Sequence, residues 1–209
     1  YSLVEEKRPG EYFPIYEDER GTFFFNSKDL CMIEYIPELI ESGITSLKIE
    51  GRMKTAYYVA TGVRAYRMAI DAYYKDPENW KFNPIWLEEL KKGSHRNFTT
   101  GFYNDKPGDE EQNYASASYV RNYDFIGIVL EDRDENGLVT VEQRNKMMLG
   151  DEIEIMGPYT DTINTTITEM YNEDGESIES APHPRQIVKM KFPEVVGRNI
   201  IRRRAIEEK

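Results

Sequence analysis

Cysteine is almost absent from this sequence, and histidine is scarce. The 209 residues include one cysteine, Cys31, and two histidines, His95 and His183. A single thiol excludes an internal disulfide framework, so the small disulfide-stapled secreted class is excluded and a reducing compartment, the cytoplasm, is expected. The two histidines lie too far apart in the sequence for the ligand spacing of a metal site.

Long apolar runs are also missing. Hydrophobic residues make up 39% of the chain, but no run approaches the ~20 residues that a membrane-spanning helix needs. The composition therefore predicts a soluble, globular protein without a membrane partner. The first residue is Tyr1, and the opening residues contain neither an apolar core nor a cleavage-site pattern. We expect no signal peptide, and we expect the native protein to begin upstream.

Positive charge is in deficit. The 27 Lys and Arg residues face 38 Asp and Glu residues, which gives a net charge of −11. A surface that binds nucleic acid everywhere is therefore excluded, and any RNA contact must be local. Basic residues concentrate at 48–54 and 198–204. The acidic runs, at 105–111, 131–135 and 171–179, are typical of solvated loops.

The first half of the chain has the pattern of an α/β domain, because helical and strand-like segments alternate. The segment 55–74 predicts the longest helix, with one apolar face formed by Val59, Val63, Tyr66, Ile70 and Tyr73. The elements expected in this half are a hairpin over 12–25, a helix over 30–36, a short helix from Pro37 to Gly43, a strand over 44–50, helices over 55–74 and 84–92, and a linker over 93–113.

Beyond residue 113 the pattern becomes all-β. Short strand-like runs recur between turn sequences, which suggests a small closed β-barrel. The expected strands are 125–130, 138–142, 152–156, 162–170, 187–192 and 200–204. We therefore predict two domains, an α/β segment over 1–113 and a β-barrel over 114–209.

The segment 44–50 and the four residues after it form the most distinctive candidate site. In a strand, Leu47 and Ile49 would share one face, while Lys48 and Glu50 would share the other. Buried charges persist when they are paired or used in function. Lys48 and Glu50 are therefore candidate catalytic residues, although a structural Lys–Glu pair in a solvated turn is the alternative.

Two basic side chains follow that segment. Arg52 and Lys54 would lie at the carboxyl end of the strand, where α/β folds place their ligands. A planar guanidinium and a point charge suit an anionic group, a carboxylate or a phosphate. His95 lies in a polar, aromatic loop, where it is a candidate general acid or phosphate contact; a hydrogen-bonded loop histidine is the alternative.

Four ordered motifs carry a resemblance to a known family. They are Arg8-Pro9-Gly10-Glu11-Tyr12, Asn26-Ser27-Lys28-Asp29-Leu30-Cys31, Leu47-Lys48-Ile49-Glu50-Gly51-Arg52-Met53-Lys54, and His95-Arg96 with Thr100-Gly101-Phe102-Tyr103. Together they resemble peptidase family U32, in the branch of the prephenate-dependent tRNA hydroxylation proteins. This resemblance implies a TIM-like barrel, of which 1–113 is the C-terminal part. A β-barrel similar to the second domain of elongation factor Tu would follow.

The same resemblance changes the interpretation of Cys31. By itself, a lone cysteine is typical of a small buried apolar residue. In the family, the cysteine of this motif is similar to one of four thiolates that hold a [4Fe-4S] cluster. The resemblance implies that Cys31 is a cluster ligand in the intact protein, with its partners upstream. The chain alone is not expected to assemble the cluster.

The function that the resemblance implies is hydroxylation of the wobble uridine of tRNA at carbon 5, with prephenate as the hydroxyl source. Glu50, Lys48 and His95 are then the expected catalytic residues. Arg52, Lys54 and Arg96 are the expected substrate-binding residues. By itself the chain is expected to be inactive, and homo- and hetero-oligomers remain open.

Two alternatives remain. The first is a collagenase-like peptidase, as the family name suggests. The sequence contains no Ser-His-Asp order, HExxH motif, Gly-rich phosphate loop or CxxC pair, and nothing supplies the nucleophile or metal-bound water of peptide hydrolysis. The second is a non-catalytic barrel that docks RNA or protein through the basic end at 198–204, for which a solvated edge strand is an equal interpretation.

Overall fold

The structure is a computed structural model that describes residues 1–4, 6–7, 9–19, 21–23, 27–106, 111, 113, 119–193, 195 and 197–205. The chain forms two compact units. Unit 1 comprises residues 1–45 and 94–120, and unit 2 comprises residues 46–93 and 121–209. Each unit therefore combines two separate segments of the sequence.

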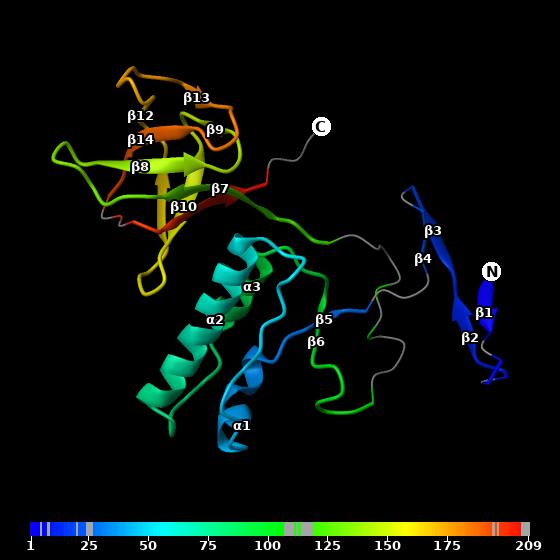
Figure 1. The fold of residues 1–209 in the computed structure, drawn as a ribbon. Coiled ribbons are helices and arrows are strands. Elements are labelled where there is room, and N and C mark those ends of the chain that lie inside the picture. The colour runs from blue at the N-terminus through cyan, green and yellow to red at the C-terminus, as the bar shows by residue number, and fades with distance from the viewer. Residues whose placement is uncertain are drawn as a thin grey trace. The chain divides into compact units, whose positions relative to one another are not determined.

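Unit 1 begins with two antiparallel strand pairs (Figure 1). Strand β1 (Ser2–Val4) pairs with β2 (Tyr12–Pro14), and β3 (Tyr16–Asp18) pairs with β4 (Gly21–Phe23). The hairpin predicted over 12–25 is thus found as β3 and β4, whereas residues 24 and 25 lie outside the described residues.

The next elements of unit 1 differ from the expected helix. Strand β5 (Asp29–Leu30) pairs in parallel with β6 (Phe98–Thr99), and the 3₁₀ helix η1 (Ile33–Tyr35) leads into α1 (Ile36–Glu41). The prediction of a helix over 30–36 was wrong at its first residue, because the backbone of Leu30 belongs to β5 and pairs with β6. That strand lies inside the predicted linker, which is therefore partly structured. The short helix was confirmed, and Gly43 follows it with a φ of +81°.

The strand predicted over 44–50 is absent, and this segment has no regular structure. A strand is stable only when its N–H and C=O groups pair with a neighbouring strand. Among the residues that the structure describes, no strand pairs with 44–50. The alternation of apolar and charged residues was a correct observation, but it was not sufficient to form a strand here.

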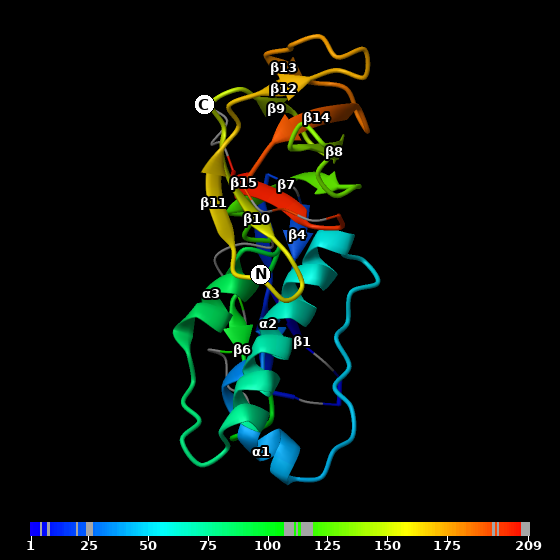
Figure 2. The ribbon, with the colours of Figure 1, turned by 90° about the vertical axis from the view of Figure 1, so that its left-hand side faces the viewer.

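Two predicted helices lie side by side in unit 2 (Figures 1 and 2). Helix α2 (Ala56–Lys75) starts after Thr55, whose hydroxyl accepts the N–H of Tyr58 at 3.3 Å. Helix α3 (Pro84–Lys91) starts after Asn83, whose amide oxygen accepts the N–H of Ile85 at 3.1 Å. These side-chain caps satisfy N–H groups that a helix leaves unbonded at its first turn. Among the described residues, no helix is long and apolar enough to cross a membrane.

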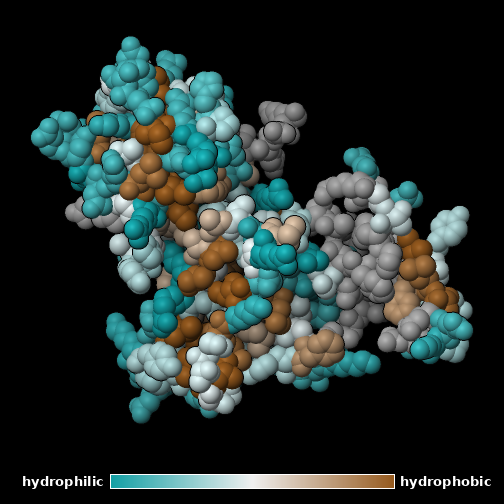
Figure 3. Space-filling view, viewed as in Figure 1, coloured by the Kyte–Doolittle hydropathy of each residue, from teal (hydrophilic) through white to brown (hydrophobic). Residues whose placement is uncertain are grey.

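The buried face of helix α2 coincides only in part with the predicted apolar face, on which Tyr66 and Ile70 are half-buried. Val59 and Val63 remain 39% and 49% exposed, although Tyr73 is buried. The buried face includes polar residues and small residues: Thr61, Gly62, Arg64, Ala65 and Ala69. Figure 3 shows hydrophobic side chains at the surface over α2. The apolar spacing therefore predicted the helix correctly but identified its buried face only in part.

The rest of unit 2 is a curled, antiparallel seven-stranded sheet in the order β11-β10-β15-β7-β8-β14-β12. The strands are β7 (Tyr123–Val129), β8 (Leu138–Gln143), β10 (Glu152–Met156), β11 (Ile163–Thr166), β12 (Met170–Tyr171), β14 (Ile187–Lys191) and β15 (Ile200–Arg204), with a separate pair β9 (Met147–Met148) and β13 (Ser180–Ala181). The strand predicted over 162–170 is split into β11 and β12. These two edge strands do not pair with each other in the described residues, so the predicted hydrogen-bonded closure is not found.

The core of the sheet contains aliphatic and sulfur-containing side chains from nearly every strand, among them Ile126, Val141, Met147, Ile155, Met190 and Ile201, each without exposed surface. Gly127 lies against this core. A Cβ atom there would clash with Met147 Cε and lie 3.0 Å from Val141 Cγ1.

Gly127→Ala is therefore expected to lower the free energy of unfolding by about 1–3 kcal/mol through overpacking. Gly62→Ala is the matched control, because its Cβ would meet Ile49 at an ordinary 3.9 Å inside a helix. That variant should gain about 0.5–1 kcal/mol of stability. Urea denaturation measures both changes, and an equal effect of the two variants would contradict this packing.

Candidate functional site

The predicted site residues divide between the two units. Unit 1 contains Cys31, His95 and Arg96, and unit 2 contains Lys48, Glu50, Arg52 and Lys54.

Arg96 is fixed in unit 1 by an aspartate of β5. Its backbone N–H donates to Asp29 Oδ2 at 2.9 Å, and its side-chain Nε donates to Asp29 Oδ1 at 3.2 Å. The guanidinium carbon lies 5.3 Å from the centre of the Tyr119 ring, within cation–π range. Arg96 is thus a positioned, ion-paired arginine beside the β5–β6 pair.

His95 is held in a defined orientation. Its Nδ1 lies 2.7 Å from the backbone oxygen of Arg96, and its ring stacks on Phe98 at 4.7 Å. Because a carbonyl only accepts hydrogen bonds, we assign the proton to Nδ1 and the lone pair to Nε2. The residue is 7% exposed, and Nε2 is buried without a hydrogen-bond partner among the described residues. His95 therefore has an Nε2 suited to accept a proton or to bind an electrophile.

Cys31 directly follows β5, and its backbone N–H donates to the oxygen of Thr99 at 2.8 Å. The residue is partly exposed. In the described part of the chain, no group of three or more His, Cys, Asp or Glu side chains is arranged to hold a metal ion. A [4Fe-4S] cluster takes four cysteine ligands, and the sequence contains one cysteine. The residues present therefore fit one ligand position and not a complete cluster.

The loop that precedes α2 contains the other candidates. Lys48, Glu50 and Arg52 are exposed, and Lys54 is half-buried. The Glu50 carboxylate accepts the backbone N–H of Arg52 at 2.9 Å, and Lys54 Nζ lies 5.1 Å from the centre of the Tyr58 ring. Lys48 and Glu50 do not belong to a strand, so the strand face predicted for them is not found. The loop instead presents its charged side chains to solvent.

A buried ion-pair network that the sequence did not suggest connects α2, α3 and the sheet of unit 2. Glu89 on α3 accepts hydrogen bonds from Arg64 on α2 at 3.0 Å and from Arg202 on β15 at 2.8 Å. Arg202 has no exposed surface, and the other two residues are each 6% exposed. Arg64 also donates to the backbone oxygens of Gly157 and Thr160 at 2.9 and 2.8 Å. Each guanidinium nitrogen of Arg64 and both carboxylate oxygens of Glu89 thus have a hydrogen-bond partner in the protein.

The network extends to the edge of the buried region. Glu154 on β10 accepts from Arg202 Nε at 2.8 Å, from Lys92 Nζ at 2.9 Å and from the Tyr123 hydroxyl at 3.1 Å. Lys92 Nζ also lies 2.9 Å from a carboxylate oxygen of Glu89. Such buried charges are costly unless each is paired and hydrogen-bonded. The network therefore fixes the helix pair to the sheet.

The environment of this network shifts several pKa values. Burial alone would raise the pKa of Glu89 and Glu154, but the charge of Arg202 and the hydrogen bonds from Lys92 outweigh burial and lower both. Burial raises the pKa of Tyr57 to about 12, despite the opposing charge of Arg202. The ionised carboxylates and the neutral phenol are thus the forms that the fold favours.

These shifts predict a pH window of stability for unit 2. The contribution of the two carboxylates is present above their unfolded pKa of about 4.3 and is lost as the pH falls through their lowered folded pKa. The contribution of Tyr57 is present below 10.0 and is lost as the pH rises toward about 12. The free energy of unfolding measured against pH should show both losses. Glu89→Gln should flatten the acid limb and Tyr57→Phe the alkaline limb; unchanged limbs would contradict the assignment.

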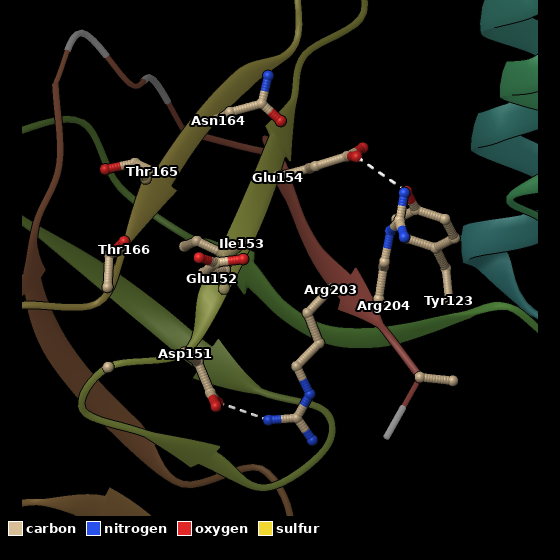
Figure 4. A pocket seen from close by; sticks show the side chains of 12 residues that line it. Tyr123, Asp151, Glu152, Ile153, Glu154, Asn164, Thr165, Thr166, Arg203 and Arg204 are labelled. Carbon is tan, nitrogen blue, oxygen red and sulfur yellow. Dashed lines mark hydrogen bonds and ion pairs between the residues drawn. The ribbon is translucent and has the colours of Figure 1, made fainter. Parts of the chain in front are cut away.

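A groove of about 790 Å³ lies on the outer side of β10 and β11 (Figure 4). Arg203 crosses it to bond Asp151, and its guanidinium also lies 3.8 Å from Asp124. With Arg202 fully buried, the middle arginines of the basic end at 198–204 are already neutralised by carboxylates. Both the docking interpretation and the solvated-edge interpretation of this end were therefore wrong for Arg202 and Arg203.

Comparison with known proteins adds independent information. The model of "Peptidase family U32" matches residues 1–113, and that of "Peptidase family U32 C-terminal domain" matches residues 121–203. The C-terminal domain of a U32 peptidase from Geobacillus thermoleovorans is 38% identical in sequence; it covers 38% of this chain and 99% of its own, with a TM-score of 0.37.

Three curated relatives are similar over most of this chain. "tRNA hydroxylation protein P1" of Bacillus subtilis is 46% identical over 178 residues, which are 85% of this chain and 42% of the relative. "tRNA hydroxylation protein P" of Escherichia coli is 38% identical over 196 residues, 93% of this chain and 42% of the relative. "Collagenase" of Porphyromonas gingivalis is 28% identical over 172 residues, 81% of this chain and 47% of the relative. The chain thus spans less than half the length of these relatives.

Proposed function

This chain belongs to peptidase family U32, and we propose that within that family it is part of a tRNA-hydroxylating enzyme. One observation carries the proposal: relatives that are 46% and 38% identical over 85% and 93% of the chain are named tRNA hydroxylation proteins. Because those relatives are more than twice as long as the matched region, the complete activity belongs to the longer protein.

The proposed reaction hydroxylates the wobble uridine of tRNA at carbon 5, and prephenate supplies the hydroxyl group. Arg52 and Lys54 hold a carboxylate of prephenate or a phosphate of tRNA, which suits the positive charge of both and the exposure of Arg52. His95 acts through Nε2, which its Nδ1 hydrogen bond leaves as an acceptor. Glu50, Lys48 and Arg96 complete the proposed set, Arg96 as a residue already oriented by Asp29.

The cofactor and the fold of the intact protein belong to the same proposal. Cys31 supplies one thiolate to an iron–sulfur cluster whose other ligands lie outside this chain. In this proposal, residues 1–113 are the C-terminal part of a TIM-like barrel, and the curled sheet within residues 114–209 corresponds to the barrel of the second domain of elongation factor Tu. The exposed apolar side chains Val59 and Val63 support the barrel, because they would be covered by its missing part.

The experiment that tests the function measures nucleosides in total tRNA by mass spectrometry. Cells that lack the gene are expected to lose wobble 5-hydroxyuridine, and a plasmid copy of the gene should restore it. A normal amount of 5-hydroxyuridine in the deletion strain would eliminate the proposal.

A peptidase is the second candidate, and the collagenase from Porphyromonas gingivalis is the observation that favours it. The intact, cluster-loaded protein would then cleave gelatin, and Glu50→Ala or His95→Ala would abolish cleavage. The tRNA hydroxylation proteins are more similar to this chain than the collagenase is, at 46% and 38% identity against 28%. We therefore expect intact gelatin after incubation; cleavage that is lost in either variant would favour the peptidase.

A further inference from the structure

Two loops at one end of the sheet in unit 2 are bonded together into a single surface. The first comprises Gln143, the last residue of β8, and residues 144–146, which lead to β9; the second comprises residues 182–186, between β13 and β14. The backbone N–H of Gln143 donates to the oxygen of Gln186 at 2.9 Å, and that of Arg185 donates to the oxygen of Gln143 at 3.2 Å. The Gln143 side chain also donates to the oxygen of Ala181 at 3.2 Å. The two loops therefore form one fixed platform, called here the paired-loop surface.

The paired-loop surface is cationic although the chain is strongly acidic. It contains Arg144, Lys146 and Arg185, and neither loop contains an acidic residue. Glu142 lies beneath them with 12% of its side chain exposed, 2.5 Å from Arg144 Nη2 and 3.5 Å from Arg185 Nε. One shielded carboxylate thus orients two guanidinium groups, and Lys146 adds an exposed ammonium. Three cations above one carboxylate favour an anionic partner.

Arg185 adds an independent observation, because its backbone is in the left-handed region with a φ of +61°. This conformation is strained for residues other than glycine and is uncommon for an arginine. The side chain is 75% exposed, and the hydrogen bond from the Arg185 N–H to the Gln143 oxygen holds the backbone in this conformation. The pairing of the loops thus fixes the position from which this exposed cation faces solvent.

The other arginines of the sheet provide the contrast. Arg202 and Arg203 are buried and bonded to Glu89, Glu154 and Asp151. Their charges are therefore unavailable to a ligand. On the paired-loop surface, by comparison, the guanidinium groups of Arg144 and Arg185 keep donors free to face solvent, since each has five N–H groups.

We propose that the paired-loop surface binds the phosphate backbone of tRNA and thereby docks the substrate of the modification. Arg144 and Arg185 contact phosphates as planar donors, and Lys146 contacts them as a point charge. The surface fixes the position of the tRNA but does not recognise its sequence, because phosphate contacts carry no information about the bases. This inference rests on the proposed function, since that function names tRNA as the partner.

The test measures binding of an unmodified tRNA transcript to the intact protein by fluorescence anisotropy over a salt series. The variant is Lys146→Ala combined with Arg185→Gly, which leaves the Glu142–Arg144 pair in place. The dissociation constant should rise about tenfold, and the slope of log affinity against log salt should fall by about 1.4–1.8 for two lost phosphate contacts. Because glycine accepts the left-handed conformation without strain, the melting temperature should equal or exceed that of the wild type.

The matched control is Lys191→Ala combined with Arg204→Ala, which removes the same charge from exposed residues elsewhere on the sheet. It should change the dissociation constant less than threefold. Unchanged binding by the loop variant, or an equal loss of affinity in both variants, would overturn the proposal that the paired-loop surface binds tRNA. If the loop variant melts early, Lys146→Glu alone provides the test, and unaltered affinity would then refute the proposal. Retained 5-hydroxyuridine in the deletion strain would instead contradict the proposed function, whereas the measured tRNA affinities of the variants would remain valid.

Discussion

Glu89→Ala is expected to lower the free energy of unfolding by about 3–5 kcal/mol, the usual cost of removing one partner from a buried ion pair. Glu89 is 6% exposed and bonds Arg64 and Arg202, of which Arg202 has no exposed surface. The substitution would leave two guanidinium groups buried without their shared carboxylate. Both tryptophans, Trp80 and Trp86, are in unit 2, so their fluorescence during urea denaturation reports on this unit.

Glu88→Ala is the matched control. It makes the same change one position earlier on α3, where the carboxylate is exposed and pairs with Lys91 at the surface. Its effect should stay within about 0.5 kcal/mol. Replacing Glu89 and Arg202 together by Leu and Met should cost less than Glu89→Ala alone, because only one buried guanidinium, that of Arg64, then loses the shared carboxylate instead of two. Equal stability of the Glu88→Ala and Glu89→Ala variants would show that the network does not hold the helices to the sheet.

Cys31→Ser is expected to remove most of the iron and sulfide from the intact protein. A cluster of the proposed type contains about four iron atoms and needs four cysteine thiolates, and a serine hydroxyl is a poor substitute for a thiolate. Cys31 is partly exposed at the end of β5, so the substitution should change the stability of the fold by less than about 1 kcal/mol. Iron and sulfide analysis measures the first effect and urea denaturation the second.

Met32→Leu controls for disturbance of the same turn, and it should leave the iron content unchanged. Full iron content in the Cys31→Ser variant would contradict the assignment of Cys31 as a ligand. A large loss of stability in that variant would instead favour the interpretation of Cys31 as a packed apolar residue.

The sequence predicted the elements that are stabilised locally. Helix α2 follows an N-cap threonine, helix α3 follows an N-cap asparagine and begins with proline, and the strands of the sheet are separated by glycine-containing turns. Caps and turns depend on residues that are close together in the chain, so they can be predicted from the sequence. The segment 44–50 and the pair β5–β6 depend on partners distant in the chain. For that reason the first was wrongly predicted as a strand, and the second was missed.

The candidate site divides in the same way. The charged loop before α2 and the Cys31 motif were recognised as sequence patterns. Lys48 and Glu50, however, lie exposed in a loop and not on the predicted strand. The buried network escaped prediction, because Arg64 and Arg202 lie 25 and 113 residues from Glu89. Each looked like an ordinary surface charge on an amphipathic element. Only tertiary packing shows that Arg202 is the most buried of all the charged residues described.

The measurement that tests the central claim most directly is the amount of wobble 5-hydroxyuridine in tRNA from a deletion strain complemented with variants. The wild-type gene is predicted to restore the modified nucleoside, and the Cys31→Ser gene is predicted not to restore it. Wobble 5-hydroxyuridine at normal levels in the uncomplemented strain would contradict the assignment of this chain to a tRNA-hydroxylating enzyme.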